Sequence, residues 1–432
     1  MNINTVTVLG ANGTMGRNVA GIFASFGNAK VFMMCRDIEK AKNAVIDSYE
    51  SIKSESIKDN LIPCTYDDLA DCISQSDLVF ESLYEDFDIK TNMYNKIVPF
   101  LKKNAIVATG TSGLSIKKLA EIFNDKSDLF FGIHMFNPPY NLTLCELIVH
   151  DNKQETLSKE LSDYLRDNLK RTVVRVKDSP SFLGNRIGFY FINEAINLAF
   201  ENKDHGGIDY IDSILGCFTG RAMAPLATAD FVGLDITKSI VDYIYDETND
   251  CFKQSFKLSN FLIKLVEENK LGRKVNCGFY KFDKDTKSKL VYDIKQDNYR
   301  NINHYEFYFS NEMIKNIGVG NYKKAFDILL NDESREACIC KSMLLKYVLY
   351  SLKIAYDVAD NIADCDDAMA TGFSWIPPIA LIELLGGIIN VQNLTKKYLD
   401  NNFIDLAFDQ NILDKLPNCC IYDFRSFLKA KY

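Results

Sequence analysis

Histidine is scarce in this sequence, with four residues among 432, so chemistry that needs an imidazole depends on very few positions. A surplus of basic residues is also absent, because the formal net charge is −8 at pH 7. Nucleic-acid phosphates bind to basic faces, so this charge argues against a nucleic-acid partner. The composition, 47% hydrophobic and 25% charged, is typical of a soluble globular protein.

Long uninterrupted apolar runs are missing too. The longest, residues 376–391, contains two prolines, a glutamate and two glycines, and it is too short to cross a bilayer. No basic leader precedes the first apolar stretch, so we expect neither a signal peptide nor a membrane segment. The twelve cysteines are scattered without zinc-finger spacing, which predicts reduced thiols, no metal site and a cytoplasmic location.

The distribution of apolar residues predicts the domains. Up to about residue 177, short apolar runs alternate with helical periodicity, the pattern of a mostly parallel sheet. Strands are expected at residues 5–9, 30–34, 76–83, 104–109, 129–135 and 144–150. After residue 177 the pattern becomes helical. The predicted fold class is an α/β Rossmann-type domain, residues 1–178, followed by all-α domains at residues 179–286 and 290–432, with a polar linker at residues 283–289.

Two stretches of the helical part are similar to one another. Residues 208–234 and residues 366–387 both run from an acidic segment through a proline to a glycine. The last domain is therefore predicted to be a degenerate repeat of the second, and chance similarity between helices is the alternative.

A glycine-rich loop lies between the first predicted strand and an amphipathic helix. In this context small residues let the backbone approach a pyrophosphate, and the helix N-terminus offers unpaired N–H groups. Compared with the usual G-x-G-x-x-G pattern the loop has one extra residue, placed at Asn12. The predicted cofactor-binding residues here are Gly10, Asn12, Gly13, Thr14, Met15 and Gly16.

The end of the second strand bears on the choice of cofactor. An acidic residue there normally accepts a hydrogen bond from the ribose 2′-hydroxyl, but this sequence has Cys35 followed by Arg36. A guanidinium pairs well with a 2′-phosphate, so we favour NADP(H) over NAD(H) and assign Arg36 to the cofactor site. The alternative is a solvent-facing Arg36 beside Asp37 as the ribose acceptor.

One histidine is well placed for catalysis. His134 closes a predicted strand before a loop that contains Asn137, and Glu146 begins the next strand twelve residues later. Antiparallel pairing of the two strands would bring the carboxylate against the imidazole, which fixes the tautomer and favours a general base.

The motifs taken together resemble the L-3-hydroxyacyl-CoA dehydrogenase family over about residues 3–285. Residues 134–139 with Glu146 are similar to the segment around that family's catalytic histidine, and residues 111–115 to its serine loop. Residues 177–186, 220–225, 229–235, 271–274 and 278–280 follow in the family's order. Gly110 and Gly113 depart from it, where asparagine and serine are common.

The resemblance implies roles for particular residues. His134 would be the catalytic base, oriented by Glu146, while Ser112, Asn137 and Asn185 would contact the substrate. The implied cofactor contacts are Glu85 and Lys90. Each residue also has a structural alternative: Ser112 as a helix cap, Asn137 as a turn residue, Asn185 as a local backbone partner, and Glu85 and Lys90 as solvated helix ends.

The activity that the resemblance implies is hydride transfer between NAD(P) and C3 of a 3-hydroxyacyl-CoA or 3-oxoacyl-CoA, in fatty acid or short-chain acyl metabolism. An acyl-CoA would be the partner, the helical domains would be of the 6-phosphogluconate dehydrogenase C-terminal type, and the chain would be a monomer or homodimer. Two alternatives stay open, a dehydrogenase of free hydroxy acids and a non-catalytic NADP-binding redox sensor.

Overall fold

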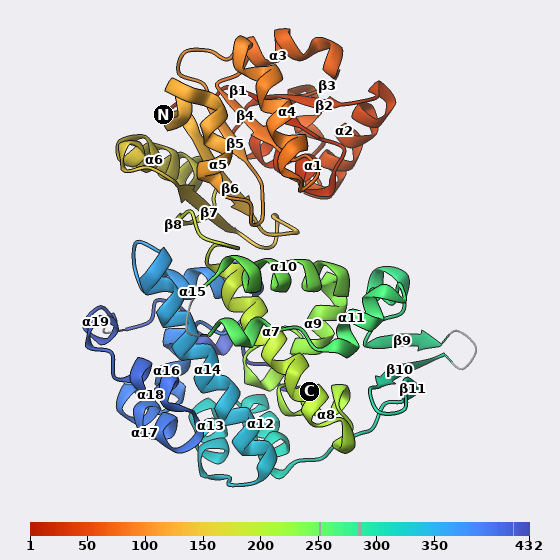
Figure 1. Cartoon of the computed structure of the whole chain (residues 1–432), viewed down its shortest axis with the longest axis vertical. Coiled ribbons are helices and arrows are strands. Elements are labelled where there is room, and N and C mark those ends of the chain that lie inside the picture. Colours follow the sequence, from red (N-terminus) through yellow and green to blue (C-terminus); the bar gives the residue numbers. More distant parts are fainter. Residues whose placement is uncertain (250–251, 284–286, 418) are drawn as a thin grey trace. The chain divides into compact units, whose positions relative to one another are not determined.

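The computed structural model describes residues 1–249, 252–283, 287–417 and 419–432. They form two compact units (Figure 1). The first contains Met1–Phe182 and Val358–Asp360, and the second contains Leu183–Asp357 and Asn361–Tyr432.

The first unit is built on one eight-stranded sheet, in the order β3-β2-β1-β4-β5-β6-β7-β8. Neighbours from β3 to β6 pair parallel, β7 runs antiparallel to β6, and β8 pairs parallel with β7. The strands are β1 (Thr5–Leu9), β2 (Lys30–Cys35), β3 (Leu61–Thr65), β4 (Leu78–Glu81), β5 (Ile106–Thr109), β6 (Phe130–Met135), β7 (Leu144–Val149) and β8 (Thr172–Lys177). This confirms the predicted parallel α/β fold.

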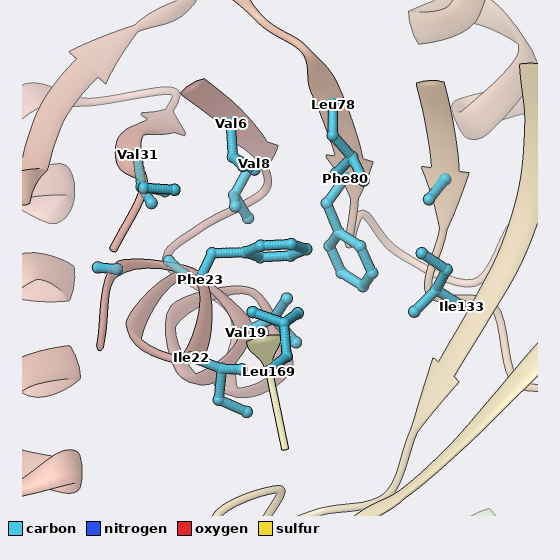
Figure 2. Close-up of a cluster of buried hydrophobic side chains, with 14 of the residues drawn as sticks. Val6, Val8, Val19, Ile22, Phe23, Val31, Leu78, Phe80, Ile133 and Leu169 are labelled. Atoms are coloured by element: carbon cyan, nitrogen blue, oxygen red, sulfur yellow. The ribbon is translucent and has the colours of Figure 1, made fainter. Parts of the chain in front are cut away.

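Helices and a buried apolar cluster complete the unit. The helices are α1 (Thr14–Ser25), α2 (Ile38–Ile52), α3 (Leu69–Gln75), α4 (Phe87–Ile97), α5 (Ile116–Ala120) and α6 (Glu155–Asp163). Phe23 of α1 lies against Val8 and Phe80 of the sheet, and Val19 and Ile22 of the same helix belong to the same buried cluster (Figure 2). Burying each such side chain stabilises the fold by roughly 1.5–3 kcal/mol, which fixes α1 beneath the strand that precedes it.

The strand order places the site. The chain moves outward from β1 to β3 on one side and resumes with β4 on the other, so the order reverses between β1 and β4. In open parallel sheets, ligands bind at the carboxyl ends of the strands at this reversal. The segments after β1, β4, β5 and β6 therefore share one edge of the sheet.

The second unit is mainly helical, as predicted, and it contains both predicted helical domains except residues 179–182 and 358–360, which belong to the first unit. Its helices are α7 (Gly184–Glu201), α8 (Ile208–Ile214), α9 (Pro225–Val232), α10 (Leu234–Glu247), α11 (Asn260–Glu267), α12 (Tyr308–Gly318), α13 (Tyr322–Asn331), α14 (Arg335–Val358), α15 (Asp364–Ala368), α16 (Pro378–Leu384), α17 (Ile388–Tyr398), α18 (Asn401–Ala407) and α19 (Gln410–Leu413).

A small sheet corrects the prediction of a linker followed directly by helix. β9 (Tyr280–Asp283), β10 (Ser288–Asp293) and β11 (Asn298–Asn301) form an antiparallel sheet in the order β11-β10-β9. The run Leu290-Val291-Tyr292 has strand propensity, and the two last residues are buried, so tertiary packing decides for strand here. Residues 284–286 of the predicted linker lie outside the described residues.

One local arrangement occurs twice in this unit. Asp212 in α8 accepts a hydrogen bond from the Leu226 N–H at the start of α9 (2.8 Å), and Asp366 in α15 accepts one from the Ile379 N–H at the start of α16 (2.8 Å). Both receiving helices begin with proline. The repeat as a whole stays a prediction.

Within the described ranges, no single helix is long and apolar enough to cross a membrane. One pair, α16 with α17, passes the same test of length and composition together but is bent by 87°.

Candidate active site

The glycine loop connects β1 to α1 and is tied to β2. The N–H groups of Gly10 and Ala11 both donate to the Met34 carbonyl at 3.1 Å, and the Gly13 N–H donates to the Gly10 carbonyl at 3.0 Å. The first turn of α1 contains no acidic residue, so its partial positive charge is not neutralised locally.

Two glycines are required by the geometry of this loop. Gly10 has φ +78°, and a Cβ there would lie 2.5 Å from the Ser82 carbonyl oxygen. A Cβ on Gly16 would lie 2.5 Å from the Gly10 carbonyl oxygen. Such a bare backbone in front of a helix N-terminus fits the pyrophosphate of a dinucleotide.

Cys35, Arg36 and Asp37 at the end of β2 bear on recognition of the cofactor ribose, and their surroundings differ. Cys35 is buried, and burial raises the pKa of its thiol. Asp37 caps α2, because its Oδ1 accepts the Lys40 N–H at 3.0 Å. Arg36 is exposed. The capping role of Asp37 weighs against its use as a ribose acceptor.

His134 and Glu146 meet as the sequence predicts. β6 and β7 pair antiparallel with His134 opposite Glu146, and the imidazole Nδ1 lies 2.7 Å from Glu146 Oε2. His134 is 5% exposed and Glu146 is fully buried. The bond to Nδ1 leaves Nε2 as the ring nitrogen for a substrate.

Aromatic rings fix the histidine from its sides. The Phe136 ring lies edge-on at 4.6 Å between centroids, and the Phe182 ring lies at 5.6 Å. Ser181 and Phe182 have φ of +57° and +55°, a left-handed conformation that costs non-glycine residues about 1 kcal/mol or more each. These two strained residues are the last two of the segment Met1–Phe182 of the first unit.

The loop after His134 is held against the sheet. The Arg171 guanidinium donates to the Pro139 carbonyl at 2.5 Å, and the Tyr140 hydroxyl donates to Asn18 Oδ1 at 3.0 Å. Asn137, a predicted substrate contact, is exposed in this loop.

Ser112 lies in the loop after β5 and is held by Glu85. Its N–H donates to Glu85 Oε1 at 2.9 Å, and the same oxygen accepts the Thr111 hydroxyl. The cap of α5 is Ser115, whose Oγ accepts the Lys118 N–H. The alternative of Ser112 as a helix cap is therefore wrong.

Lys90 is buried, so the alternative of a solvated helix end is wrong for it. Its ammonium lies 2.8 Å from Glu81 Oε1 and 3.3 Å from Glu85 Oε2. Glu81, which pairs with Lys90, is not predictable from the sequence, because nothing in the local pattern distinguishes it from other acidic residues at a strand end.

Asn185 belongs to the second unit. It lies in the first turn of α7 and is 7% exposed. Its proposed contact with the substrate therefore stays a prediction.

The fold and loop together define a protein with a Rossmann-type dinucleotide-binding unit and a helical second unit. The family model described as the NAD binding domain of 3-hydroxyacyl-CoA dehydrogenase matches residues 5–179, and the one for the C-terminal domain matches residues 182–282. The chain belongs to the 3-hydroxyacyl-CoA dehydrogenase family.

Individual relatives agree with this assignment. The chain is 31% identical over 296 residues to the mitochondrial hydroxyacyl-coenzyme A dehydrogenase of Homo sapiens, which covers 65% of this chain and 91% of that protein. It is 28% identical over 389 residues to a Rickettsia felis protein named for a fatty acid oxidation complex, covering 86% of this chain and 52% of that protein. The chain thus spans about half the length of the curated relative.

Solved structures are similar as well. The (S)-3-hydroxybutyryl-CoA dehydrogenase of Ralstonia eutropha is 29% identical, with a TM-score of 0.58 over 65% of this chain and 100% of that one. The 3-hydroxybutyryl-CoA dehydrogenase of Escherichia coli is 18% identical, with a TM-score of 0.70 over 96% of this chain and 99% of that one. At 18% identity the second likeness shows the fold alone.

Proposed function

We propose that the protein is a dehydrogenase that transfers a hydride between NAD(P) and C3 of a 3-hydroxyacyl-CoA or 3-oxoacyl-CoA. The observation that carries this proposal is the buried His134–Glu146 pair, with 2.7 Å between Nδ1 and Oε2. The pair lies at the same edge of the sheet as the glycine loop and the Ser112 loop. Relatives named for acyl-CoA dehydrogenation support the choice of substrate.

His134 moves the proton. The Glu146 carboxylate accepts the Nδ1 proton, so the lone pair of the neutral ring is on Nε2. Nε2 accepts the proton of the substrate hydroxyl during oxidation and returns it to the ketone during reduction. Glu146 stabilises the imidazolium formed in between. The bound nicotinamide supplies the hydride acceptor or donor.

The remaining polar residues orient the substrate. Ser112, fixed through its backbone by Glu85, presents a hydroxyl that can donate to the substrate oxygen. Asn137 and Asn185 are assigned to further substrate contacts. In the first unit, Gly10, Gly13 and Gly16 leave room for the cofactor pyrophosphate, and Asn12, Thr14 and Met15 belong to the same segment.

The family model supports NAD(H) binding, and we further propose a preference for NADP(H). Cys35 carries no charge to repel a 2′-phosphate, Asp37 is engaged as a helix cap, and the exposed Arg36 offers a guanidinium. A cytoplasmic location and a monomeric or homodimeric state belong to the same proposal.

Absorbance of the reduced nicotinamide with acetoacetyl-CoA tests the function. NADH and NADPH are compared in parallel on the wild type, on His134→Ala and on the control His150→Ala. The control removes a half-buried histidine whose Nε2 lies 3.2 Å from the Ser127 carbonyl. We expect the wild type and the His150→Ala control to oxidise the reduced nicotinamide, and His134→Ala not to do so. Turnover of free acetoacetate in place of the thioester would favour a hydroxy acid dehydrogenase, and cofactor binding without any turnover would favour a redox sensor.

A further inference from the structure

We propose that Tyr140 is a positioning residue for the reaction: its hydroxyl ties the loop that follows His134 to α1, the helix that begins at the glycine loop. The proposal rests on the proposed function and concerns the same site. Tyr140 lies between residues 134–139 and Glu146, the two parts of the histidine motif, and the resemblance to the family implies no role for it.

The Tyr140 hydroxyl is bound to α1 by a bifurcated hydrogen bond. It donates to Asn18 Oδ1 at 3.0 Å and to the backbone carbonyl of the same residue at 3.2 Å. Asn18 lies in the second turn of α1 and is 5% exposed. Burial raises the pKa of Tyr140, so the hydroxyl stays protonated and acts as the donor.

The surface of α1 leaves room for this hydroxyl. Gly21 follows Asn18 by about one helical turn, and a Cβ there would lie 3.3 Å from the Tyr140 hydroxyl oxygen and 3.1 Å from Ile52 Cδ1 of α2. Both distances are below the roughly 3.5–4.0 Å of a relaxed contact. The Tyr140 side chain also packs against the buried apolar cluster of the first unit. Glycine at position 21 therefore keeps open the place that the hydroxyl occupies.

The same loop has a second anchor, which does not involve α1. Arg171 is 4% exposed, and its guanidinium donates to the Pro139 carbonyl at 2.5 Å and to the Leu169 carbonyl at 2.9 Å. It holds the loop to the segment that leads into β8. Within the described residues, no hydrogen bond other than those of Tyr140 joins residues 137–141 to α1.

The contact sets the spacing between the substrate side and the cofactor side of the site. The loop begins at Phe136, whose ring lies edge-on to His134 at 4.6 Å, and it carries Asn137, a proposed substrate contact. The helix begins at the loop proposed for the cofactor pyrophosphate. Hydride transfer requires the two reactants in close contact, and a misplacement of about 1 Å can cost on the order of 100-fold in rate. Tyr140 links the two sides directly.

Tyr140→Phe removes the hydroxyl and keeps the ring. We expect kcat for acetoacetyl-CoA reduction to fall roughly three- to tenfold, the value of one neutral hydrogen bond. The NADH dissociation constant, followed by fluorescence, should change less than twofold, and the thermal midpoint should stay near that of the wild type because Arg171 still anchors the loop. The control Tyr164→Phe removes a hydroxyl of the same buried cluster that has no hydrogen-bond partner among the described residues, and it should leave kcat unchanged.

Two further variants test the contact itself. Asn18→Ala removes the side-chain acceptor and should lower kcat, but adding it to Tyr140→Phe should cause no further loss, because both substitutions break the same hydrogen bond. Gly21→Ala narrows the place of the hydroxyl and should lower kcat without removing a polar group.

Three results would overturn the proposal. The first is a Tyr140→Phe enzyme with the kcat of the Tyr164→Phe control, whether or not its thermal midpoint falls. The second is a loss of kcat in the double variant equal to the product of the two single losses. The third is weaker NADH binding in Tyr140→Phe with kcat preserved at saturation. Wild-type enzyme without turnover in this assay would instead refute the proposed function.

Discussion

Replacement of Glu146 by glutamine is the sharpest test of the catalytic role proposed for His134 and Glu146. Glutamine keeps the shape of the side chain, and its amide oxygen can still accept the Nδ1 proton of His134 at the observed 2.7 Å separation. Only the negative charge is lost. Because the carboxylate is fully buried, solvent does not screen its interaction with an imidazolium.

The size of the effect follows from the hydrogen bond that changes character. A hydrogen bond to a charged group contributes roughly 1.5–3 kcal/mol, against about 1 kcal/mol for a neutral one. A loss of about 0.5–2 kcal/mol from a state containing the imidazolium corresponds to a roughly 2- to 30-fold decrease in kcat. Larger decreases would indicate that the ring also turns away.

The assay is reduction of acetoacetyl-CoA at saturating cofactor, with kcat and KM determined separately. Glu160→Gln, an exposed glutamate of α6, is the matched control and should behave as the wild type. Binding of the reduced cofactor should be unchanged in both variants, because the charge lies against the histidine. A Glu146→Gln enzyme within twofold of wild-type kcat would refute the role assigned to this carboxylate.

Three other expectations follow from the structure. Gly16→Ala places a Cβ 2.5 Å from the Gly10 carbonyl oxygen, and it should weaken dinucleotide binding at least tenfold in a fluorescence titration. Gly13→Ala, whose Cβ would have its nearest contact at 3.4 Å, should weaken binding less. Equal losses of affinity in the two variants would contradict the steric argument. Arg36→Ala should weaken the binding of NADPH by roughly tenfold, the value of one charge-assisted contact, and leave the binding of NADH unchanged. Lys40→Ala, a nearby substitution, is the control. An equal loss of affinity for both cofactors would count against the NADP assignment. Burial raises the pKa of Asp212 to about 6, above its unfolded value, so its folded form binds a proton more readily and the protein gains stability as pH falls through 6. The destabilisation caused by Asp212→Asn should therefore grow by about 1 kcal/mol between pH 7 and pH 5 in urea titrations, and a pH-independent difference would disprove this.

Local sequence was sufficient for the parts of the site that depend on one or two neighbouring elements. The glycine loop is recognisable because strand, loop and helix are consecutive. His134 and Glu146 are twelve residues apart on adjacent strands, so alternation along a hairpin-like connection brings them together. Their antiparallel register follows from this short separation.

Other elements depended on partners that local patterns do not reveal. β3 was not predicted, because Pro63 interrupts a short apolar run, and a proline is tolerated only because β3 is the edge strand of the sheet. β8, at the opposite edge, was missed as well. In the second unit, β10 became a strand because both β9 and β11 pair with it.

The sequence by itself determined the family, the dinucleotide-binding fold and the pairing of His134 with Glu146, since each is encoded in contiguous motifs or in adjacent strands. Only the tertiary structure decided that Glu81 is buried, that Lys90 pairs with it and that Glu85 holds Ser112. These contacts join residues up to 27 positions apart, from β4, the segment after it, α4 and the segment after β5. A buried charge exists only where the surrounding fold supplies its partners, and no local pattern contains that information.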